Sequence, residues 1–376
     1  MERQPDTLII GAGPAGLAVA GCLRKAGAPF MIVERATTIG SSWRRHYDRL
    51  HLHTHRSHSA LPYLDFPAGT PRYPSRAQMV AYLEQYAHHF NLAPQLGEEV
   101  QRVSACDGGW ETRTSKSVYR TRRVVIAAGY NAIPYLPTWP GQERFRGPII
   151  HSSEYRNGEW FRGQNVLVVG FGNSGGEIAI DLHEYGALVS MAVRAAVNVV
   201  PRDILGLPIL SVSIALSRLP ASLADLLAAP LLKLTIGDLS LLGLRRPASG
   251  PITQVRTTGR IPLLDVGTIR LIREGHIRVF GGVRAMTPTG VTFDDGREGR
   301  FDAIVLATGF RSGVGRFLHG GSPVVGKRRG LYFCGFVVSA TGMLRDISRE
   351  ARQIAADIAG VDVTSRVVDT TAARSN

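Results

Sequence analysis

The chain alternates short apolar runs with longer segments of mixed character. Seven runs lack the polar residue at every second position that a half-exposed strand would show, and they cover residues 7–10, 30–33, 124–129, 166–169, 188–193, 301–310 and 331–336. Continuous apolar runs of this length are typical of strands in a parallel sheet that is covered on both faces. Strands separated by helical segments predict an α/β fold.

Apolar residues with helical spacing follow several of these runs. One helix is predicted over residues 17–25, and another ends near Glu184. Ser75 and Gln78 have the spacing of a capping box before a further helix. The apolar positions of that helix are Met79, Leu83, Tyr86, Ala87 and Phe90, and those of a last helix are Ile347, Ala351, Ile354 and Ile358. A loose tail is expected after Val361.

Three regions have patterns of their own. Residues 96–123 and 279–300 read as short strands joined by turns. Residues 204–244 are the most apolar part of the chain. Prolines and charged residues interrupt them, so the segment contains no unbroken apolar stretch of about 18 residues, the length needed to cross a membrane. We expect two short helices there, inserted into the second domain, and leave open a contact with a membrane surface.

A glycine-rich turn follows the first predicted strand, in the sequence Gly11-Ala12-Gly13-Pro14-Ala15-Gly16. The first glycine allows the tight turn, the second lets a pyrophosphate approach the backbone, and the third lets helix and strand pack closely. The free N–H groups of the helix then face the phosphates. Glu34 ends the second strand, where a carboxylate can accept both ribose hydroxyls of an adenosine. These features together predict a dinucleotide site.

The same arrangement recurs after residues 166–169, where Gly170, Gly172 and Gly175 repeat the spacing. The second strand of this unit ends at Arg194, not at an acid. A guanidinium can pair with a ribose 2′-phosphate, which a carboxylate would repel. We therefore expect FAD at the first loop and NADPH at the second, with NADH as the alternative. Arg194 could also be a solvated charge at a strand end.

Charge and cysteine content narrow the picture only slightly. The formal net charge of +14 is carried almost entirely by arginine. The arginines are dispersed and no recognition motif accompanies them, so we do not expect nucleic-acid binding. Cys22, Cys106 and Cys334 are isolated, which argues against a disulfide-reductase mechanism. The polar start of the chain leads directly into a strand, so we expect no signal peptide and a cytoplasmic location.

Four histidines, His51, His53, His55 and His58, lie close together. Three of them would share one side of an extended segment. No cysteine or acid stands at ligand spacing, so we do not expect a metal site.

Four further motifs resemble a known family. Phe145, Gly147, His151 and Tyr155 match the F-x-G-x-x-x-H-x-x-x-Y pattern of flavin-dependent monooxygenases, and Ala307-Thr308-Gly309-Phe310 matches their A-T-G-F motif. Tyr47-Asp48-Arg49-Leu50 and the L-D-V-G-T segment at residues 264–268 are similar to the YUCCA-type members, the indole-3-pyruvate monooxygenases. The resemblance covers residues 6–360.

The resemblance implies two dinucleotide-binding, Rossmann-like domains, with the NADPH domain inserted into the FAD domain. We expect the FAD domain at residues 1–157 and 285–376, and the NADPH domain at 158–284. The four residues of the monooxygenase fingerprint would link domain motion to cofactor binding, or would form a packed interdomain linker.

The expected cofactor contacts include the Gly-x-x-Trp segment that, in the family, runs beside the flavin. They are Gly11, Gly13, Pro14, Ala15, Gly16, Glu34, Arg35, Trp43, Val100, Gly170, Gly172, Asn173, Ser174, Gly175, Arg194, Thr308 and Gly309. The polar side chains expected near the flavin ring, and so the candidate catalytic residues, are His53, Arg56, Asn131 and Asn173. Arg56 could hold a substrate carboxylate.

Three functions follow from the resemblance. The first is an NADPH-dependent monooxygenase that uses a flavin C4a-(hydro)peroxide and molecular oxygen to decarboxylate an aromatic 2-oxo acid, such as indole-3-pyruvate. The second is a general flavin-containing monooxygenase that oxygenates nitrogen or sulfur centres or ketones. The third is an NADPH oxidase-type flavoprotein without an oxygenated product. The flavin carries the redox chemistry in each case, and the protein must orient it and exclude water.

Overall fold

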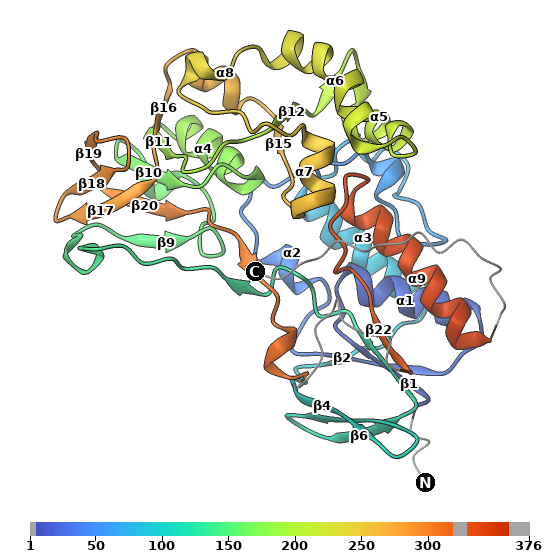
Figure 1. The fold of residues 1–376 in the computed structure, drawn as a ribbon. Helices are drawn as coiled ribbons and strands as arrows, with labels where there is room; N and C mark the ends of the chain where they lie inside the picture. The colour runs from blue at the N-terminus through green and yellow to red at the C-terminus, as the bar shows by residue number, and fades with distance from the viewer. Residues whose placement is uncertain (1–4, 319–328, 361–376) are drawn as a thin grey trace. The chain divides into compact units, whose positions relative to one another are not determined.

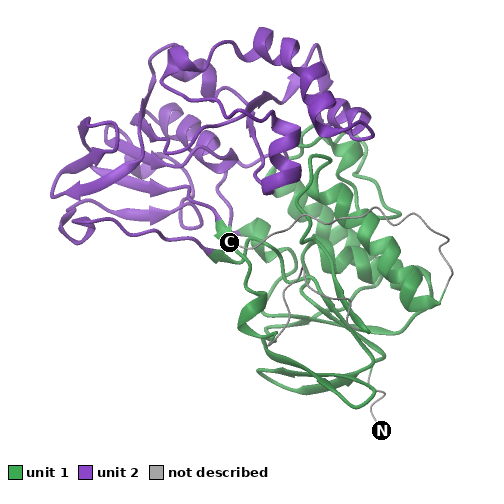
Figure 2. Cartoon of the chain, in the orientation of Figure 1, with its two compact units in different colours: residues 1–44, 54–133, 310–376 green, residues 45–53, 134–309 purple. Residues whose placement is uncertain are grey.

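A computed structural model describes residues 5–318 and 329–360 of the chain. Contacts between residues divide the chain into two compact units (Figure 2). Unit 1 comprises Met1–Arg44, Thr54–Ile133 and Phe310–Asn376, and unit 2 comprises Arg45–His53 and Pro134–Gly309. The tail predicted after Val361 lies outside the described residues.

Unit 1 is built on a five-stranded parallel sheet (Figure 1). Its order is β22-β7-β1-β2-β3, and β1 at the centre pairs with β2 and β7 along its whole length. All four residues of β1 are buried, as the apolar run predicted, because the sheet is covered on both faces. The strands are β1 (Thr7–Ile10), β2 (Phe30–Glu34), β3 (Gln95–Leu96), β7 (Arg123–Ile126) and β22 (Leu331–Phe333).

Helices α1 and α9 lie side by side in unit 1 (Figure 1). The side chains from Ala15 to Leu23 are all buried, so α1 packs against the sheet on one side and against its neighbouring helices on the other. The capping box of Ser75 and Gln78 at the start of α3 is confirmed. The helices are α1 (Pro14–Lys25), α2 (Ser41–Arg44), η1 (Arg56–His58), α3 (Arg76–His89), η5 (Val314–Arg316) and α9 (Met343–Ala359).

A three-stranded antiparallel sheet completes unit 1, as the turn-rich pattern of residues 96–123 predicted. Its strands are β4 (Val100–Cys106), β5 (Gly109–Thr114) and β6 (Val118–Thr121). Trp110 of β5 is buried, and its indole N–H donates to the Arg329 carbonyl at 3.2 Å. Two short strands, β8 (Ile133–Pro134) and β21 (Phe310–Arg311), lie where the chain passes between the units.

Unit 2 repeats the plan of unit 1 around a second parallel sheet, in the order β16-β11-β10-β20-β9. Helix α4 follows β10 just as α1 follows β1. The sheet consists of β9 (Ile149–His151), β10 (Asn165–Val169), β11 (Leu188–Ala192), β16 (Ile277–Phe280) and β20 (Ala303–Leu306), and its helices are α4 (Asn173–Glu184) and α8 (Thr268–Arg273).

Smaller elements surround this sheet. The antiparallel strands β17 (Val283–Thr287), β18 (Gly290–Phe293) and β19 (Glu298–Arg300) form one group, and two short helices are η2 (Gln142–Arg144) and η3 (Glu159–Phe161). The remaining elements are β12 (Val199–Pro201), β13 (Asp203–Ile204), β14 (Leu207–Pro208), α5 (Ile209–Leu216), α6 (Ala221–Ile236), η4 (Ser240–Leu242), α7 (Pro251–Thr258) and β15 (Leu263–Asp265).

The predicted α/β class is confirmed, and helices α5 and α6 fall within the apolar segment 204–244. Among the described residues, no helix combines the length and the apolar character needed to cross a bilayer. Contacts place residues 45–53, 134–157 and 285–309 in unit 2, which differs from the predicted division at these stretches. The domain boundaries stay predictions.

Candidate functional site

The turn between β1 and α1 has the geometry that its three glycines predict. Gly11 has φ of +112°, and a Cβ there would lie 2.5 Å from the Ala127 carbonyl oxygen. A Cβ on Gly16 would lie 1.8 Å from the Gly11 carbonyl oxygen, so helix and strand touch through bare backbone. In contrast, a Cβ on Gly13 would meet no atom within 4 Å. The turn is therefore tight on its inner side and open in front of Gly13, where Pro14 and Ala15 begin the helix.

The amide groups at the start of α1 are free to face a ligand. Gly13 is the N-cap residue, and no side chain caps the helix. A phosphate in front of Gly13 would therefore meet N–H groups that have no partner within the helix, together with the positive end of the helix dipole.

Glu34 is held at the end of β2, beside this turn. Its carboxylate accepts from the Ala12 amide at 2.8 Å through Oε2 and from the Ala36 amide at 2.9 Å through Oε1. Each carboxylate oxygen keeps a second lone pair, so both can also accept a hydroxyl. The turn and Glu34 thus fit the pyrophosphate and ribose of an adenine dinucleotide without a 2′-phosphate.

The other expected contacts of unit 1 come from three separate elements. Arg35 is exposed directly after Glu34, Trp43 is half-buried in α2, and Val100 is half-buried at the start of β4. Asn131 is exposed in the segment after β7. The Arg56 guanidinium donates to the Thr70 carbonyl oxygen within unit 1. Their roles toward a flavin stay predictions.

The turn between β10 and α4 repeats the first turn closely. Gly170 has φ of +120°, and a Cβ there would lie 2.4 Å from the Ala307 carbonyl oxygen. A Cβ on Gly175 would lie 2.5 Å from the Gly170 oxygen, whereas one on Gly172 would meet nothing within 4 Å. Gly172 is the N-cap of α4, again without a side-chain cap. Unit 2 therefore offers a second anion site of the same kind.

Arg194 lies just beyond β11, in the place that Glu34 takes in unit 1. The side chain is exposed, and its Cβ and Cγ pass over Gly282, where an added Cβ would be 3.0 Å from both. The Arg245 guanidinium donates to the Arg194 carbonyl oxygen at 2.7 Å. The Arg245 side chain is therefore held against the backbone of Arg194, close to the end of β11.

Asn173 and the L-D-V-G-T segment are linked directly. The Asn173 side-chain oxygen accepts from the Leu264 amide at 2.8 Å, which fixes β15 against the start of α4. Asp265 then caps α8 by accepting from the Gly267 and Ile269 amides at 3.2 and 3.0 Å. Thr268 is fully buried against Gly176, where an added Cβ would be 2.8 Å from its Oγ1. The L-D-V-G-T segment therefore packs against the first residues of α4, directly after the second glycine turn.

Segment 45–53 also packs onto α4. The Tyr47 ring is buried, and its hydroxyl is hydrogen-bonded to Ser174. The Arg49 guanidinium contacts Glu177 at 3.6 Å and also contacts Glu184. The Y-D-R-L motif thus has a packing explanation: Tyr47 and Arg49, two residues apart, both contact α4.

His53 is the part of this segment that was expected near the flavin ring. Its Nε2 lies 3.5 Å from Oε1 of Glu177 on α4. Burial, with Arg202 and His51 nearby, lowers the pKa of His53 to about 4, so the imidazole is neutral at neutral pH. His51 is exposed, and His55 belongs to unit 1, so the histidines do not line one side of a strand. Nothing in the described residues brings three metal-ligating side chains together.

The monooxygenase fingerprint lies entirely within unit 2. Phe145 packs in the core beneath the sheet, and Gly147 touches the Asp302 carbonyl so closely that a Cβ would be 2.0 Å away. The His151 ring is hydrogen-bonded to the Gly309 carbonyl at 3.1 Å, and the Tyr155 hydroxyl donates to Asp181 at 2.6 Å. Each of these four residues thus has a packing role of its own in unit 2.

Thr308 and Gly309 stand at the end of β20, next to this fingerprint. The Thr308 hydroxyl donates to the Tyr135 carbonyl at 2.5 Å, and Gly309 has φ of +84°. Their expected contact with a cofactor stays a prediction.

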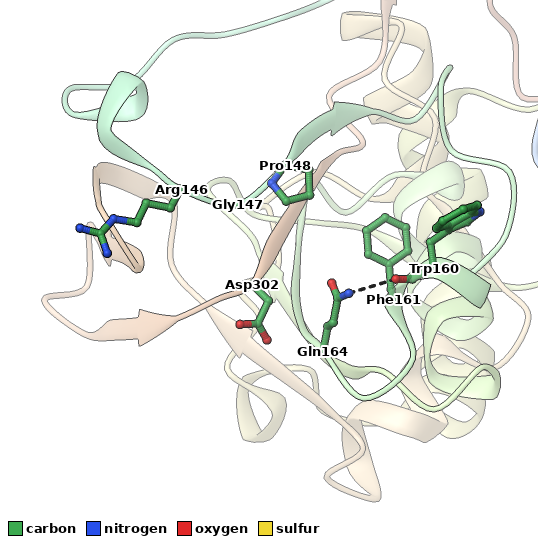
Figure 3. A pocket seen from close by; sticks show the side chains of 7 residues that line it. All are labelled: Arg146, Gly147, Pro148, Trp160, Phe161, Gln164 and Asp302. Atoms are coloured by element: carbon green, nitrogen blue, oxygen red, sulfur yellow. Dashed lines mark hydrogen bonds between the residues drawn. The ribbon is translucent and has the colours of Figure 1, made fainter.

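An open hollow of about 600 Å³ lies beside the fingerprint in unit 2 (Figure 3). Trp160, which is 85% exposed, borders it with Phe161, and the Gln164 amide donates to the Trp160 carbonyl. The remaining lining residues are Arg146, Gly147, Pro148 and Asp302. The hollow includes neither glycine turn.

Sequence reasoning missed the acidic residues of α4. Glu177 and Asp181 are both buried, and each meets a partner from a distant part of the chain. The available signal was the spacing of Asn173, Glu177 and Asp181, which puts three polar residues on one face of the helix. Burial also raises the pKa of the Tyr155 hydroxyl, which therefore stays protonated and donates to Asp181.

Comparison with known proteins agrees with this architecture. The family model described as pyridine nucleotide-disulphide oxidoreductase matches residues 8–203, which is more than half of the chain. The three cysteines are free, with Cys22 and Cys334 buried and Cys106 exposed, so no cysteine pair is placed for disulfide chemistry. The fold and the two turns thus define an oxidoreductase class with two dinucleotide-binding units.

Curated relatives identify the family within that class. The chain is 43% identical over 373 residues to the indole-3-pyruvate monooxygenase YUCCA1 of Oryza sativa subsp. japonica, which covers 94% of this chain and 91% of the relative. It is 44% identical to the probable indole-3-pyruvate monooxygenase YUCCA1 of Arabidopsis thaliana, over 84% of this chain and 77% of that one. The chain belongs to the YUCCA family of flavin monooxygenases, as its motifs predicted, and is an oxidoreductase.

Solved structures share the fold at lower identity. A flavin-containing monooxygenase from Stenotrophomonas maltophilia is similar with a TM-score of 0.71 and 23% identity, over 95% of this chain and 98% of that one. Cyclohexanone monooxygenase from Rhodococcus sp. Phi1, bound to NADP⁺, gives a TM-score of 0.72 and 20% identity, over 95% and 84%. The predicted pair of dinucleotide-binding domains is confirmed at the level of the fold.

Proposed function

We propose that the protein is an FAD- and NADPH-dependent monooxygenase that oxidatively decarboxylates an aromatic 2-oxo acid of the indole-3-pyruvate type. The main support is the pair of glycine turns with similar backbone geometry, combined with the different residue at the end of the next strand, which is Glu34 in unit 1 and Arg194 in unit 2. Family membership supports the reaction, because the relatives that cover most of the chain are named indole-3-pyruvate monooxygenases.

Unit 1 holds the FAD. Gly13 and the start of α1 would hold its pyrophosphate, and Glu34 would accept the ribose hydroxyls. Pro14, Ala15, Arg35, Trp43 and Val100 are the further residues that we assign to this cofactor. When bound, the flavin supplies the redox chemistry that activates molecular oxygen.

Unit 2 holds the NADPH. Gly172, with Ser174 and Gly175 in the same turn, would hold its pyrophosphate, and Arg194 would pair with the 2′-phosphate. Arg245 lies beside Arg194 and adds to the positive field there. Thr308 and Gly309 complete the set that we assign to the nucleotides.

The side chains expected near the reacting atoms orient the ligands and do not act as general acids or bases. His53 is neutral at neutral pH because burial lowers its pKa to about 4, so it is a hydrogen-bonding group and not a cation. Arg56 binds the carboxylate of the acid, and Asn131 contributes an amide. Asn173 acts from behind, because its side-chain oxygen is already bonded to the Leu264 amide.

The overall reaction balances with the cofactors named. One 2-oxo acid, one O₂, one NADPH and one proton give the acid shortened by one carbon, CO₂, water and NADP⁺. Molecular oxygen and the organic acid are therefore the small-molecule partners. The cytoplasm stays the predicted location.

Product analysis under ¹⁸O₂ tests this proposal. We expect the purified, FAD-loaded enzyme to convert indole-3-pyruvate and NADPH into indole-3-acetate with one ¹⁸O atom in its carboxyl group, and to release one CO₂ per NADPH. Phenylpyruvate and an aliphatic 2-oxo acid serve as matched substrates for the aromatic preference. Stoichiometric hydrogen peroxide with all three acids, or an N-oxide or sulfoxide from an amine or sulfide but no CO₂ from the acids, would rule out the reaction.

A further inference from the structure

Helix α4 carries one polar face that reaches three distant segments of unit 2. Asn173, Glu177 and Asp181 are four residues apart, so their side chains lie on one face of the helix. Asn173 accepts from the Leu264 amide and Asp181 from the Tyr155 hydroxyl. These two contacts are complete hydrogen bonds, and both hold structure in place. Glu177 lies between them and has a different environment.

The Glu177 carboxyl is only 4% exposed, yet it contacts two bases from one segment. Its Oε2 lies 3.6 Å from the Arg49 Nε, and its Oε1 lies 3.5 Å from the His53 Nε2. Neither ring nitrogen of His53 has a hydrogen-bond partner among the described residues, although both are buried. A carboxylate can only accept, so it cannot satisfy a neutral imidazole nitrogen that lacks a proton. A protonated carboxyl can donate to that nitrogen.

The surroundings put the two protonation states of Glu177 within reach near neutral pH. Burial raises the pKa of Glu177 to about 7, while Arg49 and Arg202 oppose this rise. Burial lowers the pKa of His53 to about 4, so His53 does not take up a second proton at neutral pH. A titrating proton bound by this pair therefore resides on the Glu177 carboxyl. The charged and titratable groups around the carboxyl are Arg49, His53 and Tyr47 from segment 45–53, Arg202 from the bend between β12 and β13, and Asp181 and Glu184 from α4 itself.

Glu177 also lies close to the proposed nucleotide turn. Four residues separate it from Asn173 at the start of α4, which corresponds to about 6 Å along the helix. A negative carboxylate at this depth opposes the binding of a pyrophosphate at the helix start, and a neutral carboxyl does not. By reciprocity, a bound pyrophosphate makes the carboxyl bind its proton more tightly.

We propose that Glu177 is a proton-holding positioning residue: it takes up a proton from solvent when a pyridine nucleotide binds at the α4 turn, and the protonated carboxyl donates to His53 and fixes the imidazole. In the free enzyme above neutral pH, the ionised carboxyl pairs with Arg49 instead. Nucleotide binding is thereby coupled to the placement of His53. The inference rests on nucleotide binding by unit 2 but not on the identity of the organic acid.

Binding of NADP⁺ to the FAD-loaded enzyme tests the proposal without turnover. We compare the dissociation constants of wild type, Glu177→Gln and Glu184→Gln at pH 6 and pH 8.5. The 2′-phosphate of NADP⁺ titrates in this range as well, so the useful quantity is the ratio of wild type to variant at each pH. For Glu177→Gln we expect a ratio near 1 at pH 6 and about three- to tenfold weaker binding by wild type at pH 8.5. Glu184 contacts Arg49 from the exposed side, so its variant should give the same ratio at both pH values.

Proton uptake provides the second measurement. Calorimetric titration of NADP⁺ at pH 7 in buffers of different ionisation enthalpy should show more proton uptake by wild type than by Glu177→Gln. The pH-difference infrared spectrum of wild type should contain a protonated-carboxyl band that Glu177→Gln lacks. If Glu177→Gln does not fold, His53→Asn is used, and its infrared band should titrate at a pH different from that of wild type.

The outcomes separate this inference from the proposed reaction. Equal ratios at both pH values, or equal proton uptake in wild type and Glu177→Gln, would overturn the role of Glu177 even if indole-3-pyruvate is the substrate. Conversely, the expected ratios with an enzyme that forms only hydrogen peroxide would support Glu177 and contradict the reaction.

Discussion

The two glycine turns have almost the same backbone, but the helices that follow them differ in what they present. In unit 1, the side chains of α1 from Ala15 to Leu23 are buried, and none of them is acidic. In unit 2, one face of α4 presents Asn173, Glu177 and Asp181, and each contacts a segment far away in the sequence. The glycine turn therefore provides the geometry for a dinucleotide, whereas the side chains on the helix face determine which other segments of the unit pack against the helix.

The difference follows from the neighbours of each helix. Helix α1 packs against α9, whose buried positions Ile347, Ala351, Ile354 and Ile358 are mostly apolar, so burial of apolar surface is the main source of its stability. Helix α4 meets segment 45–53, the loop around Tyr155 and strand β15 instead. These segments bring polar groups against the helix, and buried polar groups need partners.

The sharpest way to test this comparison is to fill the third glycine of each turn. In Gly16→Ala, the new Cβ would lie 1.8 Å from the Gly11 oxygen, and in Gly175→Ala it would lie 2.5 Å from the Gly170 oxygen. We expect each change to cost about 3 kcal/mol or more in its own unit, because backbone atoms must move apart. Gly16→Ala should yield colourless protein, while Gly175→Ala should keep its FAD. The flavin-to-protein absorbance ratio and thermal unfolding measure both.

Gly13→Ala is the matched control, because its Cβ would meet no protein atom within 4 Å. Its unfolding free energy should stay within about 0.5 kcal/mol of wild type, while FAD binding weakens because the methyl group occupies the space for the phosphate. A Gly16→Ala protein with full flavin content and unchanged unfolding would contradict the assigned role of the turn.

The next largest effect concerns the residue at the end of the second strand. Arg194→Ala should raise the KM for NADPH about ten- to a hundredfold and change that for NADH about twofold or less, because only NADPH has the 2′-phosphate. Arg278→Ala, an exposed arginine on the neighbouring strand β16, should leave both values unchanged. Steady-state kinetics with both nucleotides decide the matter. Equal effects of Arg194→Ala on the KM values of NADPH and NADH would contradict the proposal that unit 2, unlike unit 1, recognises a 2′-phosphate.

A smaller effect tests the polar face of α4. Asn173→Ala leaves the half-buried Leu264 amide without its acceptor, which should lower the unfolding free energy of unit 2 by about 1–2 kcal/mol. Flavin content should stay the same, since unit 1 is not affected. Asn165→Ala, an exposed asparagine at the start of β10, is the control and should change stability by about 0.5 kcal/mol or less. Chemical denaturation followed by tryptophan fluorescence separates the two. Equal stability of the two variants would mean that this contact is not required.

The smallest effect is on the pH dependence of stability, because two buried groups act in opposite directions. The pKa of His53 falls from 6.5 to about 4 on folding, so this group makes stability decrease as the pH falls through that window. The pKa of Glu177 rises from 4.5 to about 7, so this group makes stability decrease as the pH rises through its window. The two slopes partly cancel in wild type, where we expect a net change of about 1 kcal/mol or less between pH 4.5 and 6.5.

The single variants should expose each slope. His53→Asn should lose stability as the pH rises from 4.5 to 7, and Glu177→Gln should lose stability as the pH falls from 6.5 to 4. Denaturant unfolding at a series of pH values measures both. The same slope in both variants would show that one of the two groups does not titrate as its burial requires.

The sequence by itself determined the two turns, the two strand ends and the family. Glycine spacing has this power because only glycine tolerates both φ near +112° at Gly11 and a backbone oxygen at the Gly16 Cβ position, so the local residues dictate the geometry. The apolar runs likewise predicted most strands of the two parallel sheets, since burial on both faces leaves no polar alternation, but β3, β9 and β16 fall in none of these runs. The Y-D-R-L and L-D-V-G-T motifs were visible as well, but their physical reasons were not.

Only the tertiary structure decided what those motifs contact. That Asn173 reaches Leu264, or that His53 lies against Glu177, depends on segments 91 and 124 residues apart meeting on one helix face. The local sequence around each residue does not indicate which distant segment it will contact. Burial, which shifts the proton affinity of Glu177 and His53 in opposite directions, is a property of the packed unit and not of any residue in the chain.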